Sequence, residues 1–109
     1  NLELKFKMNV NSFKHQMMDG GDSYINYISP VSKKFKYHIA TMDFGKATSP
    51  YIYYKWLASR LNSQTLEEGH IPVFCYDLDD FKVIDTSLVT SILPLNKVVR
   101  QPLDNQAVS

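Results

Sequence analysis

The chain has a single cysteine, Cys75, among its 109 residues. One thiol cannot form an internal disulfide, and it cannot supply the cysteine pairs of a cysteine-based zinc site. The lack of a disulfide framework favours the cytoplasm or another reducing compartment. Because Cys75 lies inside the apolar run IPVFCY, we expect a buried thiol with a raised pKa. A nucleophile would need an accessible, electropositive setting.

Long hydrophobic runs and ligand-binding motifs are also missing. No apolar run approaches the roughly 18 residues that a membrane span needs, and no signal peptide opens the chain. The four glycines form no phosphate-binding or dinucleotide-binding loop, and the three histidines lack the spacing of a metal motif. We therefore expect no cofactor. The first residue is Asn rather than Met, so we expect a piece of a larger polypeptide or a processed chain.

The composition that remains is that of one small globular domain. Hydrophobic residues make up 44%, charged residues 21% and aromatic residues 13%, values that argue against disorder and suit a sheet. Residues 1–60 hold nine basic and four acidic residues, whereas residues 61–109 hold three and seven. This asymmetry indicates a basic and an acidic face, or two halves that neutralise each other in the fold.

Hydrophobic periodicity places the elements. Strict alternation from Leu2 to Val10 predicts a half-buried strand. Residues 11–18 (NSFKHQMM) predict two helical turns capped by Asn11 or Ser12, with Phe13 and Met17 facing inward, before the glycines at 20–21 break the chain. SYINYI (23–28) and KKFKYHIATMDF (33–44) predict two strands.

Ser49-Pro50 predicts the start of a central helix over about 50–61, because Ser caps a helix and Pro fits its first position. At 100° per residue an apolar arc faces the core. This arc contains Tyr51, Tyr54, Leu57, Ala58 and Leu61. IPVFCY then predicts an interior strand and FKVI its neighbour, while DTSLVTSIL fits a helix or a strand, ended by Pro94.

This order of elements predicts an α+β fold. We expect a single domain over residues 1–96, with a mostly antiparallel sheet of about four to five strands. The central helix and one or two short helices pack it. Residues 97–109 are expected to form a loosely packed tail.

The stretch YDLDDF (76–81) places an acidic cluster after the apolar run IPVFC. DLDD in this position resembles the first motif of the haloacid dehalogenase superfamily, which implies an aspartyl nucleophile, a general acid and a following Thr. Phe81 stands at the Thr position, and the 24 residues after Asp85 are too few for the later motifs. Two interpretations remain. One is a magnesium-dependent enzyme using Asp77, Asp79 and Asp80. The other, which we favour, is a hairpin loop from Asp77 to Asp80.

The basic, aromatic N-terminal half suggests nucleic-acid binding. Lysines on a sheet face can contact phosphates while exposed rings stack on bases of single-stranded RNA or DNA. The residues that would do so are Lys5, Lys7, Lys33, Lys34, Lys36 and Tyr37. The alternative is that these lysines only protect strand edges from aggregation.

The third interpretation is a protein-interaction domain. Ile52, Tyr53, Trp56 and Arg60 lie outside the predicted core arc of the central helix, and Trp, Tyr and Arg are enriched in interface hot spots. We expect a non-catalytic binding or regulatory domain that contacts a protein through this helix, with nucleic acid as the alternative partner. No small-molecule ligand is inferred.

Overall fold

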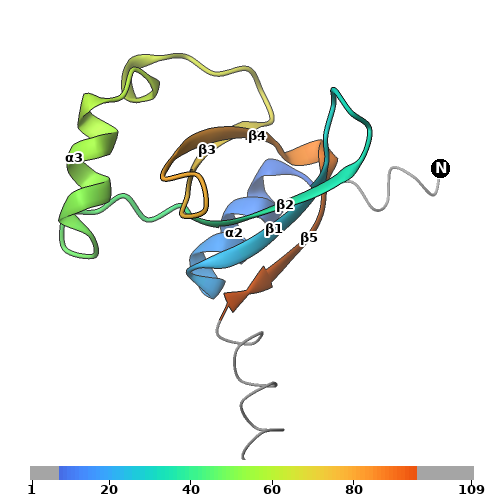
Figure 1. The fold of residues 1–109 in the computed structure, drawn as a ribbon, viewed down its shortest axis with the longest axis horizontal. Coiled ribbons are helices and arrows are strands. Elements are labelled where there is room, and N and C mark those ends of the chain that lie inside the picture. The colour runs from blue at the N-terminus through green and yellow to red at the C-terminus, as the bar shows by residue number, and fades with distance from the viewer. Residues whose placement is uncertain (1–7, 96–109) are drawn as a thin grey trace, which may run out of the picture.

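The computed structural model describes residues 8–95. In chain order its elements are α2 (Val10–Gly20), β1 (Ser23–Ile28), β2 (Phe35–Thr41), α3 (Pro50–Ala58), the 3-10 turn η1 (Leu61–Ser63), β3 (His70–Cys75), β4 (Asp80–Asp85), the 3-10 turn η2 (Thr86–Leu88) and β5 (Val89–Pro94). Figure 1 shows their arrangement.

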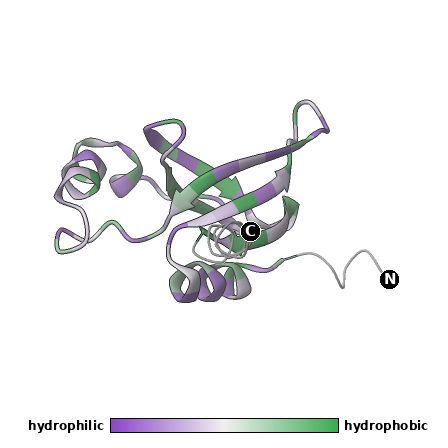
Figure 2. Cartoon of the chain, turned by 60° about the horizontal axis from the view of Figure 1, so that its bottom comes forward, coloured by the Kyte–Doolittle hydropathy of each residue, from purple (hydrophilic) through white to green (hydrophobic). Residues whose placement is uncertain are grey.

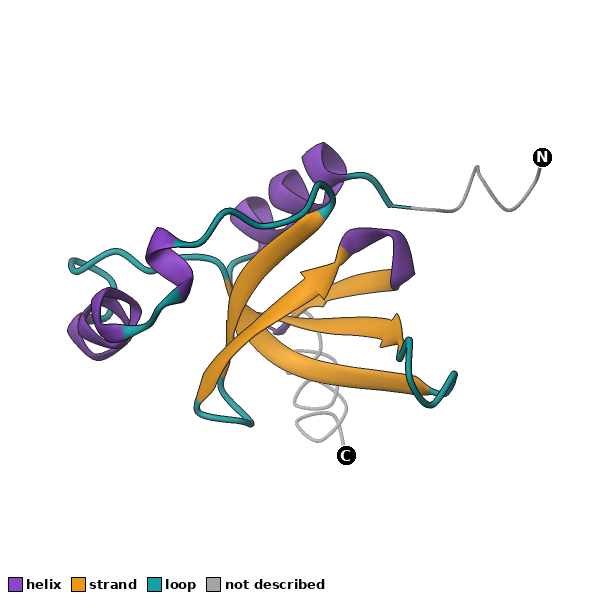
Figure 3. Cartoon of the chain, turned by 90° about the horizontal axis from the view of Figure 1, so that it is seen from above, coloured by secondary structure: helices purple, strands orange, loops and turns teal. Residues whose placement is uncertain are grey.

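The five strands form one antiparallel sheet in the order β4-β3-β2-β1-β5. The predicted α+β class with an antiparallel sheet is therefore confirmed. Figure 3 shows the strong twist of the sheet, with α2 against one side and α3 set apart beyond it. We call the face toward α2 the inner face and the opposite one the outer face. None of the described helices is long and apolar enough to cross a lipid bilayer.

Helix α2 packs on the inner face through Phe13 and Met17, which are 0% and 2% exposed. The predicted helix and its inward residues are confirmed. The predicted cap is wrong, because the Asn9 side chain accepts the hydrogen bond from the Ser12 backbone N–H at 2.8 Å. Val10, expected to end the first strand, therefore begins this helix. The other residues of that predicted strand, apart from Met8 and Asn9, lie outside the described range, as does the predicted tail.

The main core lies between α2 and the inner face. Successive side chains of a strand point to opposite faces of the sheet, so every second residue of a strand faces α2. Figure 2 shows the hydrophobic and hydrophilic bands along the strands. Its buried members are Phe13, Met17, Ile25, Tyr27, Ala40, Ile71, Val73, Cys75, Ile84 and Val89. Burial of each large apolar side chain stabilises the fold by about 1.5–3 kcal/mol, before the cost in conformational entropy is subtracted.

Helix α3 begins as predicted, with the Ser49 side chain accepting from the Ile52 N–H at 3.3 Å and Pro50 in the first turn. The predicted core arc is wrong. Tyr51, Tyr54 and Leu57 are 58%, 53% and 50% exposed, whereas Ile52 is 3% exposed. The reason is that α3 packs against the outer face of β3 and β4 rather than against the main core. Apolar and aromatic residues occur on all sides of this helix, so the hydrophobic arc could not predict which side packs against the sheet.

The C-terminal half forms two further strand pairs. The predicted hairpin after IPVFCY is confirmed, with a turn at residues 76–79 and Asp80 already paired to Cys75. The ambiguous segment DTSLVTSIL forms η2 and then strand β5, which pairs with β1. Edge strand β5 thus completes the sheet beside the N-terminal strand pair.

Candidate functional site

An exposed aromatic surface lies on the outer face of β1, β2 and β5. Tyr24 pairs with Leu93 in the register of β1 and β5, and Asn26 pairs with Tyr37 in that of β1 and β2. The strand period of two brings these four side chains to one face, where they line a shallow hollow of about 260 Å³. We call Tyr24, Asn26, Tyr37 and Leu93 the outer aromatic patch.

The patch combines large apolar area with few polar groups. The rings of Tyr24 and Tyr37 lie 5.8 Å apart, Tyr37 is 61% exposed and Leu93 is 45% exposed. Asn26 donates a hydrogen bond from its Nδ2 to the Ser91 hydroxyl at 3.2 Å. Within residues 8–95, no charged side chain lines the hollow. Phe35, two residues before Tyr37 on β2, adds a further ring that is 76% exposed.

The lysines predicted to bind nucleic acid are not gathered on this face. Lys33 and Lys34 lie in the turn between β1 and β2. Lys36 alternates to the side opposite Tyr37, where it lines a separate cavity of about 410 Å³ together with Lys82. Lys5 and Lys7 lie outside the described residues. Of the predicted lysines that the structure describes, Lys33 and Lys34 therefore lie at one end of the strands that carry Tyr37, and Lys36 lies on the opposite side.

The residues of α3 and its C-terminal end that were predicted to contact a protein differ in their exposure to solvent. Trp56 packs on Phe44 and Phe81, with ring centroids 4.7 and 5.2 Å away. Ile52 is buried, Tyr53 is half-buried and Arg60 is exposed. Trp56 thus belongs to an aromatic cluster that holds α3 to the outer face of β4.

The three weak metal candidates in YDLDDF point to different partners. Asp77 accepts from His38, Asp79 accepts from the Tyr51 hydroxyl, and Asp80 accepts from the Phe81 backbone N–H at 2.7 Å. The predicted convergence of these carboxylates does not occur. Asp80 accepts from the backbone next to it, whereas Asp77 and Asp79 connect the hairpin turn to β2 and α3.

A polar cluster lies where β2 meets the β3–β4 turn. His38 Nδ1 is hydrogen-bonded to a carboxylate oxygen of Asp77 at a distance of 2.7 Å. The other ring nitrogen, Nε2, lies 2.9 Å from the Tyr27 hydroxyl oxygen. The Ile39 backbone N–H donates to the other Asp77 oxygen at 3.3 Å. Burial acts to raise the pKa of Asp77, but the hydrogen bond and charge of His38 outweigh it and lower the pKa.

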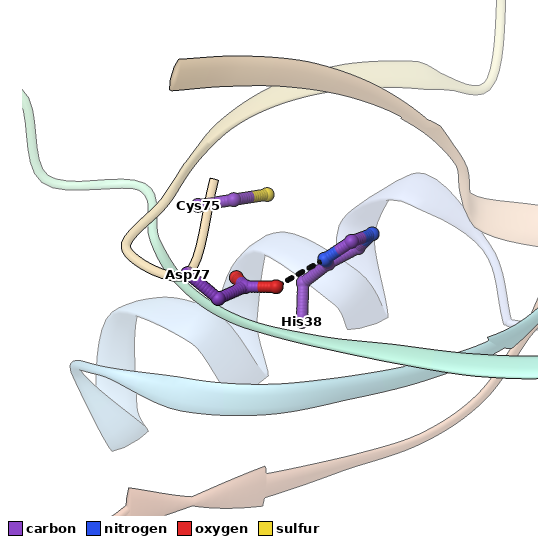
Figure 4. Close-up of side chains that lie close together, drawn as sticks. All are labelled: His38, Cys75 and Asp77. Carbon is purple, nitrogen blue, oxygen red and sulfur yellow. Dashed lines mark hydrogen bonds and ion pairs between the residues drawn. The ribbon is translucent and has the colours of Figure 1, made fainter. Parts of the chain in front are cut away.

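Cys75 lies beside this cluster (Figure 4). Its sulfur, a His38 ring nitrogen and an Asp77 oxygen all lie within 4.8 Å of one another. Burial, and then the Asp77 charge, raise the pKa of Cys75 to about 12. The predicted buried thiol with a raised pKa is confirmed. A neutral, fully buried thiol is a poor nucleophile, so the Cys-His-Asp composition does not indicate cysteine-protease chemistry.

No protein-family model, no curated protein and no solved structure matches this chain. Sequence reasoning missed Tyr24, Asn26 and Leu93, although alternation within SYINYI puts the first two on one side. It also missed the neighbourhood of His38 and Cys75, which depends on the pairing of β2 with β3.

Proposed function

We propose that this chain is a non-catalytic binding domain that contacts another protein through the outer aromatic patch. The observation that carries the proposal is the ring pair of half-buried Tyr24 and exposed Tyr37 beside exposed Leu93, around a hollow that no charged residue of the described range lines. Tyrosine is among the residue types that dominate interface binding energy. Its ring supplies large contact area at low conformational cost.

The chemistry of the patch favours an apolar protein surface as the partner. Interface cores are depleted of charged residues, and none of the described residues that line the hollow is charged. The Tyr24 and Tyr37 hydroxyls and the Asn26 amide offer hydrogen bonds at the rim of an apolar contact. The patch lies on strands rather than on a loop, so the side chains are held in place before binding, which lowers the entropic cost of association.

The same surface offers less to a nucleic acid. Base stacking on Tyr37 and Phe35 is feasible, but single-strand binding needs a track of cations along the backbone. Among the lysines of the described range, Lys33 and Lys34 lie near that end of the face, whereas Lys36 lines the cavity on the other side. Two phosphate contacts would give a salt slope of roughly −1.4, which is weak for a dedicated binder.

Site-specific photo-crosslinking tests the proposal. A photoreactive phenylalanine analogue replaces Tyr37 in one variant and Tyr54, which is 53% exposed on α3, in the control variant. Each is irradiated in an extract of the cells that naturally produce the protein. We expect a discrete protein adduct from position 37 and none from position 54.

Competition makes this result specific. Excess unlabelled wild-type protein should abolish the adduct, whereas a Tyr24→Ser, Tyr37→Ser double variant should not. An adduct that survives wild-type competition, or that forms equally from position 54, contradicts the proposal. Salt-sensitive binding of a labelled oligonucleotide that is lost in the same double variant would instead support the nucleic-acid alternative.

A further inference from the structure

His38, Cys75 and Asp77 are brought together by the pairing of β2 with β3. Ala40 pairs with Cys75, and the Tyr76 N–H donates to the Ile39 carbonyl at 2.8 Å. Continuing this antiparallel register places Asp77 across from His38. Residues two apart on a strand share a face, so Cys75 is the diagonal neighbour of His38 on the inner face. The three side chains therefore meet through main-chain hydrogen bonding, not through a chance approach of mobile loops.

The three ligand atoms have the chemistry of a transition-metal site. A thiolate, an imidazole nitrogen and a carboxylate oxygen are the three ligand types of zinc sites in proteins. Adjacent ligand atoms around tetrahedral zinc are separated by roughly 3.2–3.8 Å. The present atoms lie within 4.8 Å of one another, and His38 Nδ1 and the nearer Asp77 oxygen are 2.7 Å apart. A contraction of about 1 Å at the widest pair and an opening of about 0.5 Å at the closest pair therefore complete the arrangement.

The surrounding hydrogen bonds are those that metal ligands commonly have. A ligating histidine usually donates its second ring N–H to another group, which fixes the orientation of the ring. The Tyr27 hydroxyl lies 2.9 Å from His38 Nε2, and the two rings stack with centroids 5.6 Å apart. Asp77 is similarly held by the Ile39 N–H, which leaves its other oxygen directed at His38.

Access and desolvation also suit a bound ion. Cys75 is fully buried and the His38 side chain is 13% exposed, whereas the Asp77 side chain is 38% exposed. An ion can therefore reach the cluster from the turn side and exchange part of its water shell for protein ligands. The fourth coordination position then remains on the solvent side, next to Asp77.

We propose that His38 Nδ1, Cys75 Sγ and one Asp77 oxygen bind Zn²⁺, with water as the fourth ligand. The ion replaces the protons on Cys75 Sγ and His38 Nδ1, which are released to solvent, and in the bound state His38 is neutral with its one proton on Nε2 and donated to Tyr27. The soft thiolate and the imidazole select Zn²⁺ over Mg²⁺ and Ca²⁺, which prefer all-oxygen sites. The ion links β2 to the β3–β4 turn, and its binding free energy adds to the stability of the fold.

Cobalt substitution provides the test, because Co²⁺ occupies zinc sites and reports a thiolate ligand by absorption. The full chain is reduced, freed of metal with a chelator and titrated with Co²⁺. We expect a thiolate-to-cobalt charge-transfer band that saturates at one equivalent and disappears when Zn²⁺ is added. Zn²⁺ at about 100 times its dissociation constant should raise Tm by roughly 10 °C, whereas Mg²⁺ should leave it unchanged.

Matched variants separate this site from incidental metal binding. Cys75→Ala should abolish the band, and His38→Gln and Asp77→Asn should each weaken Zn²⁺ binding at least about 10-fold, as should the supporting change Tyr27→Phe. The controls are His70→Gln, a second histidine of the sheet, and Asp80→Asn, a second carboxylate of the hairpin. Both controls should bind Zn²⁺ as the wild type does.

Three outcomes overturn the proposal: a wild-type cobalt spectrum without the thiolate band, retention of the band in Cys75→Ala, or equal weakening in His70→Gln and His38→Gln. Where a variant at a buried position does not fold, X-ray absorption of the zinc-loaded wild type decides. It should show one sulfur at about 2.3 Å and nitrogen or oxygen ligands at about 2.0 Å. A zinc coordination shell that contains oxygen and nitrogen but no sulfur would contradict the proposed site.

Discussion

The Tyr51 hydroxyl donates a hydrogen bond to the Asp79 carboxylate, with distances of 2.8 and 3.0 Å to its two oxygens. This contact joins the first turn of α3 to the turn between β3 and β4. Asp79 has a positive φ of 52°, a conformation that Asp and Asn adopt more readily than most residues. The same residue thus shapes the turn and connects it to the helix.

The Tyr51–Asp79 contact predicts a change in stability at alkaline pH. The hydrogen bond to Asp79, followed by burial and the Asp79 charge, raises the pKa of Tyr51 above its ordinary value of 10.0. The stabilisation is therefore complete below the ordinary pKa and is lost as the pH rises through the raised pKa. Asp79→Asn keeps the turn conformation and should lower the pKa of Tyr51. The difference in phenolate absorbance between the two proteins during an alkaline titration measures this effect.

The control for that titration is Asp80→Asn. The Asp80 side chain accepts from the Phe81 backbone N–H, whereas the Tyr51 hydroxyl bonds to Asp79. Its tyrosine titration should therefore match that of the wild type. Identical curves for Asp79→Asn and the wild type would show that the Tyr51 hydrogen bond does not form in solution.

Lys33 predicts a stabilising substitution in the β1–β2 turn. It has a φ of 63°, and its N–H donates to the Ser29 carbonyl at 2.9 Å. A left-handed residue with a Cβ costs roughly 1–2 kcal/mol, part of which glycine recovers. Lys33→Gly should raise the free energy of unfolding by about 0.5–1 kcal/mol, whereas Lys34→Gly, at a position without positive φ, should lower it. Urea denaturation measures both, and shifts of the same sign would contradict the expectation.

The aromatic cluster predicts the fluorescence of the single tryptophan. Trp56 contacts Phe44 and Phe81, so its emission should be blue-shifted and weakly quenched by iodide. Phe44→Ala removes the closer ring and should move the emission to longer wavelength and increase quenching. Tyr54→Ala, which changes an exposed residue on the other side of α3, should leave both quantities unchanged. A red-shifted wild-type spectrum would mean that α3 does not pack on β4.

Local signals in the sequence were sufficient for most element positions. Ser49-Pro50 and the glycine pair at 20–21 mark helix ends because capping and positive φ depend on neighbouring residues only. The side of α3 that packs could not be predicted in the same way. Trp56 contacts a cluster assembled from distant residues such as Phe81, and the exposed side of the helix also carries large side chains, Tyr51, Tyr54 and Leu57.

The candidate sites depend even more on long-range pairing. Alternation could assign Tyr24 and Asn26 to one side of a strand, but Leu93 joins them only because β5 pairs with β1. Likewise, His38 meets Cys75 and Asp77 only through the pairing of Ala40 with Cys75. Such pairings connect residues far apart in the chain, and no spacing motif records them.

The core position of α2 predicts the largest loss of stability. Phe13 is fully buried against the inner face, so Phe13→Ala leaves a cavity in addition to losing its transfer free energy. We expect it to lower the free energy of unfolding by about 3–5 kcal/mol, a large part of the roughly 5–15 kcal/mol of a typical domain. Met18→Ala, on the same helix but 78% exposed, should change it by less than about 0.5 kcal/mol. Urea denaturation measures both values, and a Phe13→Ala loss below about 1 kcal/mol would place α2 outside the core.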